Sequence, residues 1–249
     1  MGAFGYNPVR AYQALFVGAF GTPADVLETL AFATPLTLTA LTFSVGVRAG
    51  LFNIGAEGQM YLGAIGTTLV AGMIPLPPGI HVAVATITGM LFGAAWAMIP
   101  ALLKVWRGVH EVISTIMANW IAFHLSTYLA INFLGDPTRA DRTVPALPSA
   151  RYPVLTEDAT LSAVIFVAVA FCAAIYLYLW GTRAGYELRL GGENPDAARY
   201  AGVNANRVML LSFVIGGLAA GLAGASQIIG RPPAWSLYAT LGNVSTLGF

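Results

Sequence analysis

Long uncharged segments alternate with short charged ones along this chain of 249 residues. The uncharged, mainly apolar runs are Leu30–Val47, Gly58–Leu103, Val112–Gly135, Ala159–Thr182 and Val208–Gly230. A helix needs about 20 apolar residues to cross the hydrocarbon of a bilayer. The second run is long enough for two such helices, and prolines at 75, 77 and 78 divide it. The pattern therefore predicts six transmembrane helices.

Helices suit these runs better than strands, because none of them alternates strictly between apolar and polar residues. Backbone polar groups must be satisfied internally in lipid, which leaves helices or closed barrels. We therefore predict an all-α, polytopic helical membrane protein, with residues 1–249 forming a single transmembrane domain. The uncharged tail from Pro232 to Phe249 has prolines and a polar Gly-Asn-Val-Ser-Thr segment, so it makes a poor seventh span. We expect it to be re-entrant or the start of a further element.

Composition supports a membrane protein and excludes several other classes. The chain is 57% hydrophobic and only 9% charged, whereas a soluble domain is about a quarter charged. The net charge of +1 provides no basic face for a nucleic-acid polymer. One cysteine and three scattered histidines offer no metal-ligand spacing. Lys104, the only lysine, follows no Gly-rich phosphate loop, so an enzyme that hydrolyses ATP by itself is not expected.

Small residues recur at four-residue spacing in two of the runs, as Gly89 and Gly93 and as Gly217, Gly221 and Ala225. Such spacing lets membrane helices approach closely, and we interpret these positions as packing seams.

The basic residues give the orientation of the spans. Seven lie in the loops after spans one, three and five, and five lie on the opposite side. Loops rich in Lys and Arg stay in the cytoplasm, which places the loop from 183 to 207 there.

That loop contains a short polar helix with strong local boundaries. Asn194 is a good N-cap, Pro195 suits the first helical position, and Gly202 can end the helix in a left-handed conformation. Ala197, Tyr200 and Ala201 share one face at i, i+3 and i+4. The face fits a groove on another protein, and an ordinary capped helix on the membrane surface would have the same pattern.

Three separated segments resemble one family: RAGLFNIGAEGQMYLGA (48–64), GVHEVISTIMANWIA (108–122) and GTRAGYELRLGGENPDAARYAGVNANRV (181–208). They are similar to the permease subunits of bacterial ABC importers for nucleosides and simple sugars. The resemblance runs from about Asn7 to Phe249. It implies a permease of the bacterial inner membrane that forms the translocation path and binds no cofactor itself.

The resemblance also implies the partners. They are a cytoplasmic ATP-binding subunit that hydrolyses ATP, a second permease subunit, an extracytoplasmic substrate-binding protein and the lipid bilayer. The short helix would be the coupling helix, docking into a cleft of the ATPase. The residues assigned to this coupling are Gly192, Glu193, Asn194, Pro195, Ala197, Ala198, Tyr200, Ala201 and Gly202. Because family members have further spans at both ends, we expect this chain to be truncated at both ends.

Polar residues inside the predicted spans are candidates for the substrate path, since ionisable groups are costly in a membrane. Asn53, Glu57 and Gln59 lie in a Gly-rich stretch that permits a broken or tightly packed helix. Glu57 fits equally well at the membrane interface, where it would only hold a loop.

Glu111, Thr115 and Asn119 share one helical face at i, i+4 and i+8. Such a stripe either hydrogen-bonds a substrate or joins neighbouring helices, and the second use is the commoner one. Trp120, next to Asn119, has a ring that can stack on a base. An ion-gradient-driven secondary transporter or channel is the alternative function, and it would require paired ionisable groups and inverted repeats.

Overall fold

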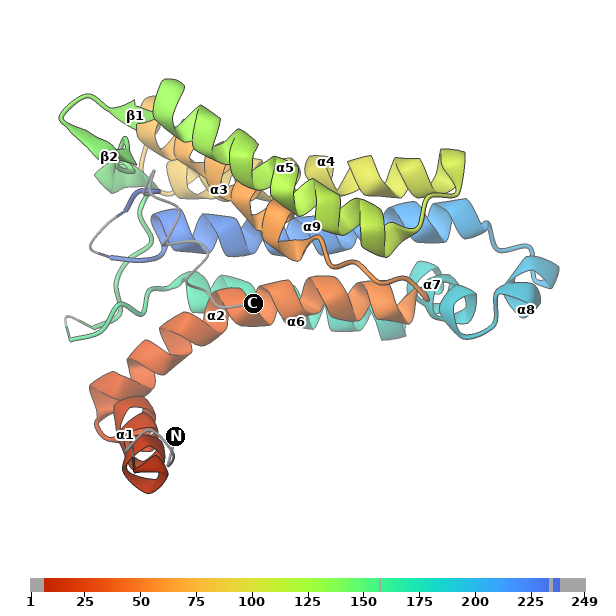
Figure 1. Ribbon diagram of the computed structural model, residues 1–249, viewed down its shortest axis with the longest axis horizontal. Helices are drawn as coiled ribbons and strands as arrows, with labels where there is room; N and C mark the ends of the chain where they lie inside the picture. The colour runs from red at the N-terminus through yellow and green to blue at the C-terminus, as the bar shows by residue number, and fades with distance from the viewer. Residues whose placement is uncertain (1–6, 157, 233–234, 238–249) are drawn as a thin grey trace.

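Six long helices form the body of the molecule, at the six positions predicted from the sequence (Figure 1). The computed structural model describes residues 7–156, 158–232 and 235–237. The long helices are α2 (Pro23–Arg48), α3 (Ala56–Met73), α4 (Ile80–Arg107), α5 (Glu111–Asn132), α6 (Val164–Gly181) and α9 (Ala205–Ile229). Most of the tail discussed above, residues 238–249, lies outside the described residues.

Five of the six helices are long and apolar enough to cross a membrane, and α3 is not among them. In the described residues, the prediction of six transmembrane helices is therefore confirmed for five of them. α3 carries Glu57 and Gln59 in its first turn and several glycines and threonines along its length. Thirteen of its eighteen residues are nevertheless buried, so neighbouring helices, rather than lipid, enclose it.

Small residues bring α3, α4 and α9 into direct backbone contact, which confirms the predicted packing seams. A Cβ atom added to Gly63 would lie 2.6 Å from the Cα of Gly221. One added to Gly93 would lie 2.7 Å from the same Cα, and one added to Gly217 would lie 2.6 Å from the Cα of Ala94. No side chain fits at these distances, so the three helices form one tightly packed unit.

The connections fall into two groups at opposite ends of the bundle, as the distribution of Lys and Arg predicted. The turns that follow α2 and α4 lie at one end, together with α7 (Arg183–Glu193) and α8 (Pro195–Tyr200) (Figure 1). The other end carries α1 (Pro8–Phe20), the strands β1 (Gly135–Asp136) and β2 (Arg139–Thr143), and the short helix η2 (Pro148–Ala150). We refer to the first group as the cytoplasmic end, after the orientation predicted from Lys and Arg.

The loop after α5 contains a hairpin that the sequence analysis missed. β1 and β2 pair antiparallel, and the Asp136 carboxylate accepts hydrogen bonds from the Thr138 amide at 2.8 Å and from Arg142 Nε at 2.9 Å. Hydrogen bonds from Thr138 and then from Arg142 lower the pKa of the Asp136 carboxyl. The Asp136 carboxylate thus joins the turn and the second strand of the hairpin.

Candidate functional site

The chain between α2 and α3 is not helical, although part of it lies at the depth of the bundle. Gly50, with φ of +72°, turns the chain at the cytoplasmic end, and residues 51–54 then run back between the helices (Figure 1). As a result, α3 begins part-way along the bundle. Non-helical backbone at membrane depth is tolerated only where protein buries it or where it lines a cavity. This interruption is the break that the glycines of the segment allowed.

Asn119 on α5 holds the interruption in place with both ends of its amide. Its Nδ2 donates to the Ile54 carbonyl at 3.0 Å, and its Oδ1 accepts from the Gly58 amide at 3.0 Å. Gly58 lies in the first turn of α3, where backbone N–H groups have no partner inside the helix. The Asn119 side chain therefore supplies hydrogen-bond partners both to the non-helical segment before α3 and to the first turn of α3.

Asn53 and Gln59 form a buried amide pair inside the interruption. The Asn53 Oδ1 accepts from the Gly55 amide at 3.0 Å and from Gln59 Nε2 at 3.1 Å. Both side chains are at most 2% exposed. Within the described part of the chain, Asn53 Nδ2 and Gln59 Oε1 have no hydrogen-bond partner. Buried polar groups are nearly always paired, so these two atoms are unusual.

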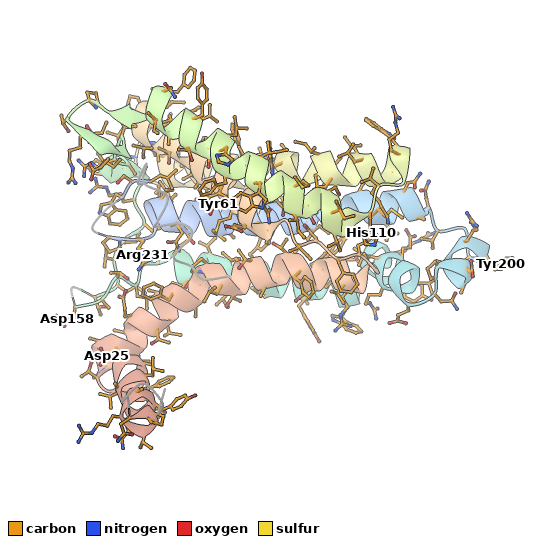
Figure 2. The ribbon with its side chains drawn as sticks, viewed as in Figure 1. Asp25, Tyr61, His110, Asp158, Tyr200 and Arg231 are labelled. Carbon is orange, nitrogen blue, oxygen red and sulfur yellow. The ribbon has the colours of Figure 1, made fainter. Side chains whose placement is uncertain are left out.

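Glu57 lies beside a group of aromatic rings. Its Oε1 accepts a hydrogen bond from the Tyr61 hydroxyl at 2.8 Å, and Figure 2 shows Tyr61 midway along the bundle. The Tyr61 ring meets Phe123 edge-on at 5.9 Å, and Phe123 meets Trp120 at 6.3 Å. Trp120 also stacks on His124 and is 61% exposed. We call Glu57, Tyr61, Trp120, Phe123 and His124 the aromatic patch.

Glu111 and Thr115 have structural partners. Glu111, at the cytoplasmic end of α5, receives Lys104 Nζ at 2.6 Å, and its side chain is 8% exposed. The Thr115 hydroxyl donates to the Glu111 carbonyl at 2.8 Å. Of the predicted stripe on α5, Asn119 contacts the start of α3, Glu111 pairs with Lys104 of α4, and Thr115 bonds a carbonyl of its own helix. In the described residues, no group of three or more His, Cys, Asp or Glu is placed to hold a metal ion.

The short helix predicted at the cytoplasmic end is α8, and its local boundaries are confirmed. The Asn194 side chain accepts from the Ala197 amide at 2.9 Å, Pro195 is the first helical residue, and Gly202 has φ of +78°. Tyr200 is 95% exposed at the tip of the molecule (Figure 2).

Three of the residues grouped with this helix do not belong to an exposed face of it. Gly192 and Glu193 belong to the last turn of α7, an additional helix that the prediction missed. Ala198 is buried against its own chain, where its carbonyl accepts from the Val203 amide at 2.9 Å. The other residues of α8 are exposed, and we call the side formed by Ala197, Tyr200 and the C-cap residue Ala201 the exposed face of α8.

The sequence analysis also missed Tyr61, Phe123 and His124. Trp120, Phe123 and His124 follow one another at i, i+3 and i+4, a spacing that puts them on one face of α5. That spacing was the available signal.

A bundle of apolar helices around an interrupted polar segment is typical of membrane transport proteins. The chain belongs to the family of branched-chain amino acid transport system permease components, which matches residues 26–241.

Named relatives support this membership. The chain is 38% identical over 233 residues to the nucleoside ABC transporter permease protein NupB of Lactococcus lactis, covering 89% of this chain and 64% of the relative. It is 37% identical over 229 residues to the guanosine ABC transporter permease protein NupP of Bacillus subtilis, covering 91% and 66%. It is 35% identical over 241 residues to the glucose ABC transporter permease protein TsgB13 of Haloferax volcanii, covering 92% and 63%.

The chain thus spans about two thirds of the length of these curated relatives. No solved structure matches it.

Proposed function

We propose that this chain is the permease subunit of an ATP-driven importer of nucleosides in the cytoplasmic membrane. The observation that carries the proposal is the interrupted polar segment at membrane depth beside the aromatic patch. Two of the relatives described above are named for nucleoside or guanosine transport. A nucleobase offers a flat π face for an exposed ring such as Trp120, and its amino groups suit a carboxylate such as Glu57. These features favour a nucleoside over a simple sugar.

In this proposal, the substrate path runs along the face of the aromatic patch, between this chain and a second permease subunit. The path residues are Asn53, Glu57, Gln59 and Trp120, while Thr115, Asn119 and Glu111 position them. An extracytoplasmic binding protein delivers the substrate to the end that carries β1 and β2. The exposed face of α8 docks on a cytoplasmic ATP-binding subunit, which supplies ATP hydrolysis. ATP switches access across the membrane because it binds the two arrangements of the complex with different affinity.

The test is transport by the complex purified from native membranes and placed in proteoliposomes. Uptake of tritiated guanosine, uridine and glucose is measured with and without ATP on the side of the ATPase. We expect ATP-dependent uptake of the two nucleosides. Uptake that follows an imposed ion gradient without ATP would contradict the proposed ATP-driven import. Uptake of glucose alone would contradict nucleosides as the substrate class.

Replacing Trp120 by leucine is expected to raise the KM for nucleoside uptake about tenfold, because stacking of one base on an aromatic ring is worth about 1–3 kcal/mol. The measurement is the concentration dependence of guanosine uptake in proteoliposomes. Trp106→Leu is the matched control, since Trp106 is also exposed, at 71%, and lies at the end of α4 away from the patch. An equal rise of KM in both variants would remove Trp120 from the path.

A further inference from the structure

The last turn of α7 and the turn between α2 and α3 are in close backbone contact. A Cβ atom added to Gly192 would lie 2.6 Å from the amide nitrogen of Gly50 and 2.8 Å from the carbonyl carbon of Ala49. One added to Gly50 would lie 3.1 Å from the Cα of Gly192. Real Cβ atoms do not come within 3.0 Å of backbone, so a side chain at 192 forces the two segments apart. We call this the Gly50–Gly192 contact.

Each side of the contact leads directly to one of the two functional regions. Gly192 comes two residues before Asn194, the N-cap of α8. Gly50 opens the interruption, and Asn53, which binds the Gly55 amide and Gln59, lies three residues further on. The contact is thus a short path between the helix proposed to meet the ATPase and the segment proposed to meet the substrate.

The residues around the Gly50–Gly192 contact are closely packed, so a displacement of one segment is passed on to the other. A Cβ atom on Gly46 would lie 3.0 Å from the Leu51 carbonyl oxygen and 3.4 Å from the Asn53 amide nitrogen, so α2 packs closely along the interruption. Leu51 is buried in one apolar cluster with Leu188 of α7 and Val208 of α9. Close-packed interiors transmit displacement rather than absorb it.

Open space lies beside this contact. A cavity of about 570 Å³ is lined by Gly50, Lys104, Glu111, Gly192 and Arg199, among others. It separates α8 from the ends of α4 and α5 and gives the α7–α8 segment room to move. The buried Asn53 Nδ2 and Gln59 Oε1, which lack partners in the described residues, are the atoms that can gain partners when the interruption shifts.

We propose that the Gly50–Gly192 contact is the mechanical link through which α8 and the interruption before α3 move together during transport. The proposal rests on the proposed function. It makes Gly50 and Gly192 positioning residues that act through the backbone of the interruption, without touching the substrate. Movement passes between packed elements that have two discrete arrangements, as in other switching proteins.

The experiment compares Gly192→Ala with Gly191→Ala in the complex from native membranes. Both glycines lie in α7, and the atoms nearest to a Cβ at 191 belong to the Val208 side chain, the closest at 3.3 Å. Three quantities are measured per folded complex: the amount of ATPase subunit that co-purifies, basal ATP hydrolysis, and ATP-dependent guanosine uptake. We expect Gly192→Ala to keep the first two and to lose uptake at least about tenfold, because a displacement of about 1 Å can cost as much as 10²-fold. Gly191→Ala should keep all three.

A second pair tests the other side of the contact. Gly50→Ala strains a turn in which Gly50 has φ of +72°. Gly108→Ala is the control, because Gly108 has a similar φ of +65° but an added Cβ atom there has no neighbour within 4 Å. We expect only Gly50→Ala to uncouple hydrolysis from uptake.

The outcomes separate the two proposals. If no ATPase subunit co-purifies with the wild-type complex, the proposed function fails. If the wild-type complex transports and Gly192→Ala transports within twofold of it, the mechanical link is wrong. The link is also wrong if Gly191→Ala loses as much uptake as Gly192→Ala. Failure of both Gly50→Ala and Gly192→Ala to fold, with both controls folded, would make the contact purely structural and overturn the link.

Discussion

Replacing Lys104 by methionine is expected to destabilise the folded protein by about 3 kcal/mol, because it leaves the Glu111 carboxylate buried without its partner. The two groups lie 2.6 Å apart, and the Glu111 side chain is only 8% exposed. For a chain of this size, the loss corresponds to a fall of the unfolding midpoint by roughly 6–12 °C. The measurement is thermal unfolding of the purified protein in mild detergent.

The double variant Lys104→Met/Glu111→Gln is expected to recover most of the lost stability, since removing both charges leaves neither one uncompensated. Arg183→Met is the matched control, because Arg183 forms an ion pair with Glu187 at 3.0 Å but is 92% exposed. Exposed pairs contribute about 1 kcal/mol or less. If Lys104→Met and Arg183→Met have the same midpoint, the buried pair is not a significant source of stability.

The variant Ala197→Asp is expected to release the ATPase subunit from the complex. It places a charge in the centre of the exposed face of α8, between the positions of Tyr200 and Ala201 on the helix. A buried, unpaired charge at an interface costs enough to reduce co-purification of the partner by about tenfold or more. The measurement is the amount of ATPase subunit recovered per molecule of this chain from native membranes.

Ala205→Asp is the control for this prediction. Ala205 is also exposed at the cytoplasmic end, and an aspartate there begins α9, where a negative charge is favourable. Ala198→Asp is unsuitable, because Ala198 is buried and a charge there disturbs folding of this chain itself. Full recovery of the ATPase with Ala197→Asp would exclude α8 as its docking site.

The helices and the caps of α8 were predictable because they depend on neighbouring residues. Long uncharged runs locate the spans, and Asn194 and Pro195 define a helix start wherever the chain lies. The direction in which Ala198 points was not predictable, because it depends on Val203 folding back after the turn at Gly202. Local chemistry decides that a helix forms, and tertiary contacts decide which face is covered.

In the candidate site, too, local features were predictable and long-range contacts were not. The sequence places Asn119 on one face of α5 with Glu111 and Thr115, and it leaves open whether that face binds a substrate or joins neighbouring helices. Its partners, the Ile54 carbonyl and the Gly58 amide, are more than sixty residues away in the chain. The periodicity of α5 does not reveal that the Asn119 side chain bonds the non-helical segment before α3. The interruption itself was visible only as a stretch of glycines that permitted it.

The enclosure of α3 has a consequence for biosynthesis. α3 is not apolar enough to enter the membrane alone, and its tight contacts are with α4 and α9. α9 is the last of the six long helices to leave the ribosome. When α3 has left the ribosome and α9 has not, the side of α3 that later packs on α9 is therefore uncovered. We therefore expect slower synthesis of α9 to lengthen the interval during which α3 lacks its packing partner.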